Sequence, residues 1–178
     1  MQPISIPLSK TKILLLLAGA ILFVVGGCWM LVKAPTVSNP VLSNIYVVRT
    51  VGVAAVLFFG LCAVYAARKL FSTRPGFVID DFGITDNSGG ISVGAIPWSD
   101  MLNITIMMAQ RQKFIMIHVK NPEDYINKQT SFIKRKMMQM NHKAYGSPLA
   151  LSANSLRTSF GELFNLLRDQ FEKRNKPQ

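Results

Sequence analysis

Acidic residues are missing from the first 79 positions of this 178-residue chain. All nine aspartates and glutamates lie at or after Asp80, whereas seven of the twenty lysines and arginines lie before Pro75. Residues 75–178 therefore have a net charge of +4, and the other +7 of the formal +11 belongs to the front of the chain. Most of this basic excess flanks apolar segments, and Lys134-Arg135-Lys136 has no interleaved aromatic side chains for base stacking. We therefore expect no nucleic-acid partner.

Charge is also missing from two long apolar runs, at 13–32 and at 50–67, the second extending back through Arg49 to residue 45. About 20 helical residues cross a hydrocarbon core about 30 Å thick, so we predict transmembrane helices at about 13–32 and 45–67. The first run is longer than the apolar part of a cleavable signal. The apolar residues after Cys28 disfavour a lipoprotein site at that cysteine. Arg49 is expected to extend its side chain to the interface.

More basic residues lie before the first run and after the second than beside the linker between them. Lys10 and Lys12 precede the first run, and the second is followed by three more bases, Arg68, Lys69 and Arg74. Only Lys33 and Arg49 border the linker at 33–44, where Pro35 and Pro40 suit a turn. The positive-inside rule predicts a helical hairpin with both termini in the cytoplasm and the linker outside.

Cysteine is scarce, and its two copies are far apart. In an antiparallel hairpin, Cys28 lies near the outer end of the first helix and Cys62 near the inner end of the second. Such a pair is well beyond the roughly 7 Å Cα separation that a disulfide allows. No spacing typical of metal ligands or of a phosphate-binding loop occurs either, so we expect no disulfide, no metal and no cofactor.

From Pro75 onward, apolar residues recur with period two, which indicates strands separated by turns. The expected strands are 77–80, 82–86, 91–96, 101–109 and 113–119. Pro97 is unsuited to the interior of a central strand, so Trp98-Ser99-Asp100 is predicted to be a bend between two of them. We predict that Trp98 is a buried structural residue at this corner. Asp100 is expected to stabilise the corner by accepting backbone N–H bonds.

One long basic amphipathic helix is predicted at 122–143, with Asn121 as its cap and a stop near Gly146. Its apolar stripe is Ile126, Ile133, Met137 and Met140, while Lys128 and Arg135 face the opposite way and Lys134 and Lys136 flank the stripe. After a short strand at 148–152, apolar residues from Leu156 to Phe171 follow the spacing of a helix that covers a sheet. Ser159 and Glu162 match a capping box, so this helix begins at Ser155 or Ser159.

The order of these segments, together with the motifs Ile96-Pro97-Trp98-Ser99-Asp100 and Tyr145-Gly146-Ser147-Pro148, resembles small bacterial two-span membrane proteins with a pleckstrin-homology-like domain. The resemblance covers nearly the whole chain. It implies an α+β fold: a membrane hairpin at 1–74, then a cytoplasmic antiparallel β domain at 75–178 with a long inserted helix and a C-terminal capping helix. It also implies a location in the bacterial inner membrane and a family mostly without assigned biochemistry.

Residues that could carry catalysis have simpler structural explanations. His118 lies within a strand and His142 near a helix C-terminus, where its charge is favourable. Asp80-Asp81 suits a turn, and Glu123-Asp124 suits a helix N-terminus. No nucleophile elbow occurs. We therefore do not expect an enzyme.

Two binding functions remain for the cytoplasmic domain. The first, which we favour, is an interaction or scaffolding module for a protein partner, because the hairpin already supplies membrane anchoring. The second is a reader of anionic lipid, in which Lys128, Lys134, Arg135 and Lys136 lie against the inner leaflet. If the helix instead packs its apolar stripe onto the domain, these four bases form a solvated face.

Overall fold

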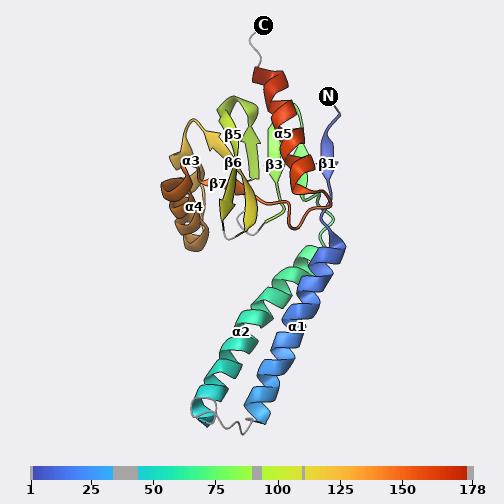
Figure 1. The fold of residues 1–178 in the computed structure, drawn as a ribbon, viewed down its shortest axis with the longest axis vertical. Helices are drawn as coiled ribbons and strands as arrows, with labels where there is room; N and C mark the ends of the chain where they lie inside the picture. The colour runs from blue at the N-terminus through green and yellow to red at the C-terminus, as the bar shows by residue number, and fades with distance from the viewer. Residues whose placement is uncertain (1, 34–43, 90–93, 110, 176–178) are drawn as a thin grey trace. The chain divides into compact units, whose positions relative to one another are not determined.

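The computed structural model describes residues 2–33, 44–89, 94–109 and 111–175, and it is of mixed α+β class (Figure 1). The chain forms two compact units, one from residues 10–73 and the other from residues 1–9 together with 74–178. The division expected from the sequence placed residues 1–9 with the membrane helices. They belong instead to the unit that contains the sheets, because a short strand in this segment pairs there.

Residues 10–73 contain two helices, α1 (Lys10–Val32) and α2 (Ile45–Leu70), and both are long and apolar enough to cross a membrane. They pack together at small residues: a Cβ added to Gly27 would lie 3.0 Å from the carbonyl oxygen of Gly52. Farther along, the rings of Phe23 and Phe59 stack with centroids 4.2 Å apart. Asn44 caps α2 by accepting a bond from the Tyr46 N–H. Residues 34–43, most of the expected linker, lie outside the described residues.

The first sheet is antiparallel and has the strand order β1-β2-β3-β4. Its strands are β1 (Ile4–Ile6), β2 (Phe77–Ile79), β3 (Gly83–Asp86) and β4 (Gly94–Pro97). The sequence did not predict β1, which pairs Ile4 with Ile79 and Ile6 with Phe77. Residues 91–93 of the expected third strand, where Ile91 and Val93 were expected to share the core-facing side, lie outside the described residues. Gly83 permits the close approach of β4, because a Cβ there would clash with the Ile96 carbonyl.

The second sheet, of order β5-β6-β7, is also antiparallel. It contains β5 (Met101–Ala109), β6 (Gln112–Val119) and β7 (Leu149–Leu151). Alternate residues of β6 and β7 point into the core, where Ile115, Ile117 and Leu149 are fully buried. The strands expected at 101–109 and 113–119 are thus confirmed, and the last strand is shorter than expected.

The predicted long helix is in fact two helices, α3 (Pro122–Asn127) and α4 (Phe132–Tyr145). The interruption follows from Gln129-Thr130-Ser131, since threonine and serine favour caps over helix interiors. Ser131 occupies the N-cap position of α4, and Gly146 ends it at φ 74°, as expected. Asn121 stands at the N-cap of α3, but its side chain makes no capping hydrogen bond.

The C-terminal helix α5 (Phe160–Asn175) begins directly after Ser159. Both bonds of the capping box form: the Ser159 N–H donates to Glu162, and the Glu162 N–H donates to the Ser159 hydroxyl. The carboxylate of Glu162 accepts bonds from the Ser159 N–H and the Thr158 hydroxyl, and both lower its pKa. Leu163 and Leu167 are fully buried, so the helix covers the core with the predicted face.

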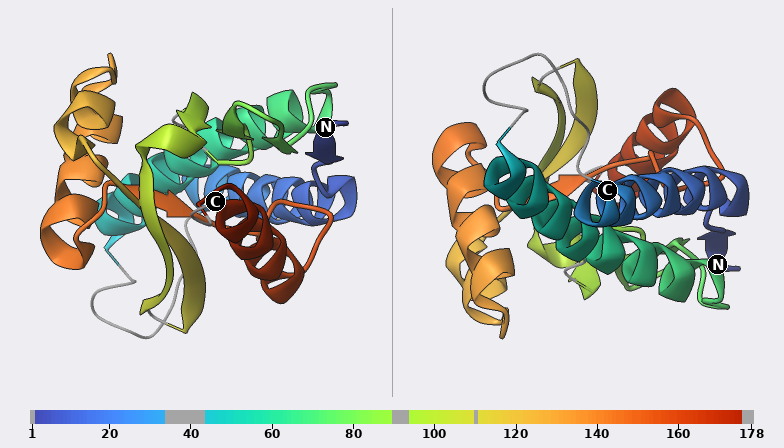
Figure 2. Two further views of the ribbon diagram at one scale, coloured as in Figure 1. Left: turned by 90° about the horizontal axis from the view of Figure 1, so that it is seen from above. Right: turned by 90° about the horizontal axis from the view of Figure 1, so that it is seen from below.

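Within this unit, α3 and α4 lie on one side of the β5-β6-β7 sheet and the first sheet lies on the other (Figures 1 and 2). The core between the sheets is apolar. Its most deeply buried members include Phe77, Ile84, Ile96, Ile115, Ile117, Leu151 and Leu156.

Candidate functional site

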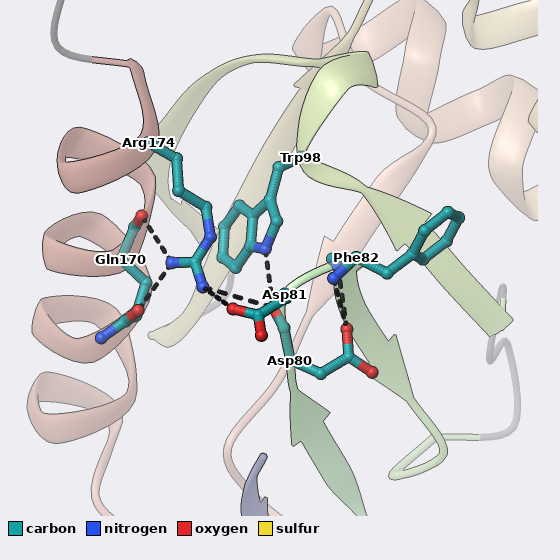
Figure 3. Close-up of polar contacts among 7 residues, drawn as sticks. Asp80, Asp81, Phe82, Trp98, Gln170 and Arg174 are labelled. Carbon is teal, nitrogen blue, oxygen red and sulfur yellow. Dashed lines mark hydrogen bonds and ion pairs between the residues drawn. The ribbon is translucent and has the colours of Figure 1, made fainter. Parts of the chain in front are cut away.

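Trp98 forms the corner between β4 and β5, in a short 3-10 helix (Trp98–Asp100), and it is only 6% exposed. Its indole N–H donates to the carbonyl of Asp80 at 2.9 Å (Figure 3). The side chain of Asp80 accepts the N–H groups of Phe82 and Gly83, both at 3.0 Å, and thereby closes the β2–β3 turn. The tryptophan is therefore a buried corner residue, and Asp80 has the turn role expected from the sequence.

Arg174 of α5 covers the outer side of this corner (Figure 3). Its guanidinium carbon lies 4.8 Å from the centroid of the Trp98 ring. Its Nη1 donates to the Gln170 side chain at 2.7 Å, and its Nη2 lies 3.4 Å from the Asp81 carboxylate. These contacts connect the C-terminal helix both to the β2–β3 turn and to the corner at Trp98. The sequence pattern did not identify Arg174 as a partner of Trp98.

Asp100 has a different partner from the one expected. Its Oδ2 accepts the hydroxyl of Tyr125 in α3 at 2.7 Å, so its carboxylate binds a side chain rather than backbone N–H groups. Burial raises the pKa of Tyr125, and the hydrogen bond to Asp100 raises it further. The corner is thus tied to α3 as well as to α5.

The two histidines considered for catalysis lie in β6 and in the last turn of α4. His118 Nε2 lies 2.9 Å from the hydroxyl of Thr105 on the neighbouring strand, whereas Nδ1 of His142 is buried with no hydrogen-bond partner in the described part of the chain. Among the described residues, no group of three histidine, cysteine or acidic side chains is placed to hold a metal ion.

The four predicted lipid-binding bases do not share one surface. Lys128 is exposed at the end of α3, and its ammonium lies 5.5 Å from the Tyr125 ring centroid. On α4, Lys136 is exposed and Lys134 is half-buried, but Arg135 turns inward and donates to the carbonyl of Gln129 at 2.9 Å. Arg135 therefore holds the α3–α4 connection, while the three lysines remain at the surface.

The apolar stripe expected on this segment is divided in the structure. Ile126 is buried in α3 at 1% exposure, whereas Ile133, Met137 and Met140 of α4 are 70%, 44% and 61% exposed. Met138 is the buried residue of α4, with no exposed surface. The α4 helix therefore presents most of its apolar stripe to solvent and packs its other face, which includes Met138, on the domain.

A second exposed apolar surface lies on β5, at the edge of its sheet in the described part of the chain. This strand has nine residues and no charged side chain, and its residues Leu102, Ile106 and Met108 are exposed. Natural edge strands are commonly protected by charges or prolines, and β5 has neither. The alternating pattern predicted the strand but not its place at an edge.

Comparisons of the chain with models of protein families, with curated proteins and with solved structures gave no match. The assignment of function therefore depends on the geometry of these surfaces.

Proposed function

We propose that this chain is an integral membrane protein with two spans that presents a pleckstrin-homology-like module on the cytoplasmic side, where the module binds a protein partner. The observation that carries the binding function is the uncharged edge strand β5 with its exposed apolar side chains. An extended segment of the partner would add to this edge through backbone hydrogen bonds, and Ile106 and Met108 would supply side-chain contacts.

The pairing of β1 with β2 supports the two-span arrangement. β1 precedes α1 and β2 follows α2, yet Ile4 pairs with Ile79 in one sheet. A single sheet can contain strands from both flanks of the helix pair only if both flanks lie on the same side of the membrane. An even number of membrane crossings gives this result. The basic residues that precede α1 and follow α2 favour the cytoplasm as that side. The contacts between Gly27 and Gly52 and between Phe23 and Phe59 follow the order of an antiparallel hairpin.

The arrangement of the sheets supports the pleckstrin-homology-like assignment. Two antiparallel sheets enclose the core, and α5 covers it as a C-terminal capping helix. The insertion of α3 and α4 before β7 is the departure that the sequence already indicated. A bacterial inner membrane as the location follows from the same resemblance.

Photo-crosslinking in cells would test the protein-binding proposal. A photoreactive amino acid at the exposed Met108 of β5 should give a discrete crosslinked protein, whereas one at the exposed Asn165 of α5 should not. Ile106→Lys should abolish the Met108 crosslink because it places a charge on the edge, and it should leave the fold intact because Ile106 is exposed. The same crosslinks from both probe positions, or a Met108 crosslink that persists in Ile106→Lys, would contradict the proposal.

A further inference from the structure

The exposed side of α4 combines large apolar side chains with lysines. Ile133, Met137, Met140 and Ala144 follow the i, i+4, i+7, i+11 spacing of one helix face, and all four are exposed. Phe132 begins the helix at 77% exposure. Five of the fourteen residues of α4 are thus both apolar and exposed. Single exposed apolar residues are common on surface helices, whereas a group of this size indicates an interaction surface.

The charges beside this face are all of one sign. Lys136 and Lys143 border the apolar residues on one side of the helix, and Lys134 borders them on the other. The segment Phe132–Tyr145 contains no acidic residue. Lys128, at the end of α3, adds an exposed base nearby in the chain. A protein partner would need a surface that is both apolar and acidic, whereas an anionic bilayer offers both properties everywhere on its surface.

We propose that α4 docks on an anionic bilayer surface, with Phe132, Ile133, Met137 and Met140 entering the boundary between headgroups and acyl chains. Lys134, Lys136 and Lys143 contact the lipid phosphates. This is the geometry of an interfacial amphipathic helix, whose binding grows with buried apolar area and with attraction to anionic lipid. Arg135 is not part of the surface, because it is committed to Gln129. The inference rests on the proposed membrane anchoring, which brings the helix close to lipid, and is independent of the β5 edge.

The test uses the full chain, with Cys28→Ser and Cys62→Ser, in liposomes of phosphatidylcholine alone or with 30% phosphatidylglycerol. An environment-sensitive fluorophore on Met137→Cys should shift to the blue and be quenched by acyl-chain spin labels in the anionic liposomes only. The same fluorophore on Asn165→Cys of α5 should stay in water in both. Lys134, Lys136 and Lys143 changed together to glutamine should reduce the docked-to-undocked ratio about a hundredfold, because each near-surface base contributes about fivefold.

A matched control removes three exposed charges elsewhere, with Lys120, Arg157 and Lys173 changed to glutamine. This variant should dock as the parent does. A fluorophore at position 137 that stays in water in anionic liposomes would overturn the proposal. So would one that is shielded equally in both lipids, which would indicate a protein contact. A fluorophore on Leu22→Cys within α1 distinguishes the failures: if it is quenched by the same spin labels while position 137 is not, the membrane anchoring stands and the α4 proposal alone fails.

Discussion

Arg174 lies over the face of Trp98, with its guanidinium carbon 4.8 Å from the ring centroid. Through this contact the last turn of α5 closes the corner at which the chain passes from the first sheet to the second. The indole N–H simultaneously binds the Asp80 carbonyl, so the β2–β3 turn, the corner and the C-terminal helix meet at one side chain.

Trp98→Ala should destabilise the sheet-containing unit by about 3–5 kcal/mol, the usual cost of removing a buried aromatic side chain. Arg174→Gln should cost less, about 0.5–2 kcal/mol, because it removes a partly exposed cation–π contact and keeps the ring buried. Denaturant unfolding of the detergent-solubilised chain, followed by tryptophan fluorescence for Arg174→Gln and by proteolysis for both, measures these differences. The control is Arg168→Gln, which breaks an exposed ion pair with Glu172 and a partly exposed cation–π contact with Phe164 at 5.8 Å, and it should lower stability by no more than about 1 kcal/mol. A Trp98→Ala variant as stable as the parent would contradict the structural role.

The N-terminal strand yields a second prediction. Ile6 and Leu8 are both 8% exposed although they precede α1, and Leu8 bridges to Leu156. Ile6→Ala should therefore destabilise the sheet-containing unit by about 2–5 kcal/mol, while Ser5→Ala on the exposed side should have little effect. Protease resistance of residues 74–178 in denaturant measures the difference. Equal resistance of the two variants would show that β1 does not contribute to the core.

The strand β1 is an element that the sequence pattern could not predict. Ile4-Ser5-Ile6 is too short for its alternation to identify a strand, and its partner Phe77–Ile79 is brought to it only by the tertiary fold. By contrast, β5 and β6 are long enough for period two to predict them. The capping box at Ser159 and the stop at Gly146 were predictable for another reason, since each depends on a few neighbouring residues.

The surface of α4 illustrates a different limit. Its periodicity separates an apolar face from a polar one, but it does not say which of them packs on the domain. The face containing Arg135, Met138 and His142 turns inward, since Met138 is fully buried and Arg135 finds the Gln129 carbonyl. The sequence thus identified the basic residues of this segment. It did not predict that Arg135 turns inward, because the Gln129 carbonyl that Arg135 binds lies in the break between α3 and α4.

Alkaline pH should weaken the hydrogen bond from Tyr125 of α3 to Asp100 at the corner. The pKa of Tyr125 is raised above its usual value of 10.0 by burial and by the bond to Asp100. A raised folded-state pKa means that the stabilisation is fully present below pH 10 and is lost as the pH rises above it. Tyr125→Phe, which cannot ionise, should lose part of the parent's stability at pH 7 but show a smaller further decrease between pH 9.5 and 11. Parallel stability curves for the two proteins over that interval would contradict the assignment.

The orientation of the chain in the membrane is open to a direct experiment. With Cys28→Ser and Cys62→Ser, a cysteine at Ser38, in the segment between α1 and α2, should react with an impermeant thiol reagent on intact cells. A cysteine at Asn127 of α3 or at Asn165 of α5 should react only after the cells are permeabilised, since both positions are exposed on the unit expected inside. The physical reason is the placement of Lys10, Lys12, Arg68 and Lys69 at the ends of the helices that lead into that unit. Labelling of Asn127→Cys on intact cells with protection of Ser38→Cys would reverse the orientation. It would leave the pairing of Ile4 with Ile79 as evidence that both flanks still share one side.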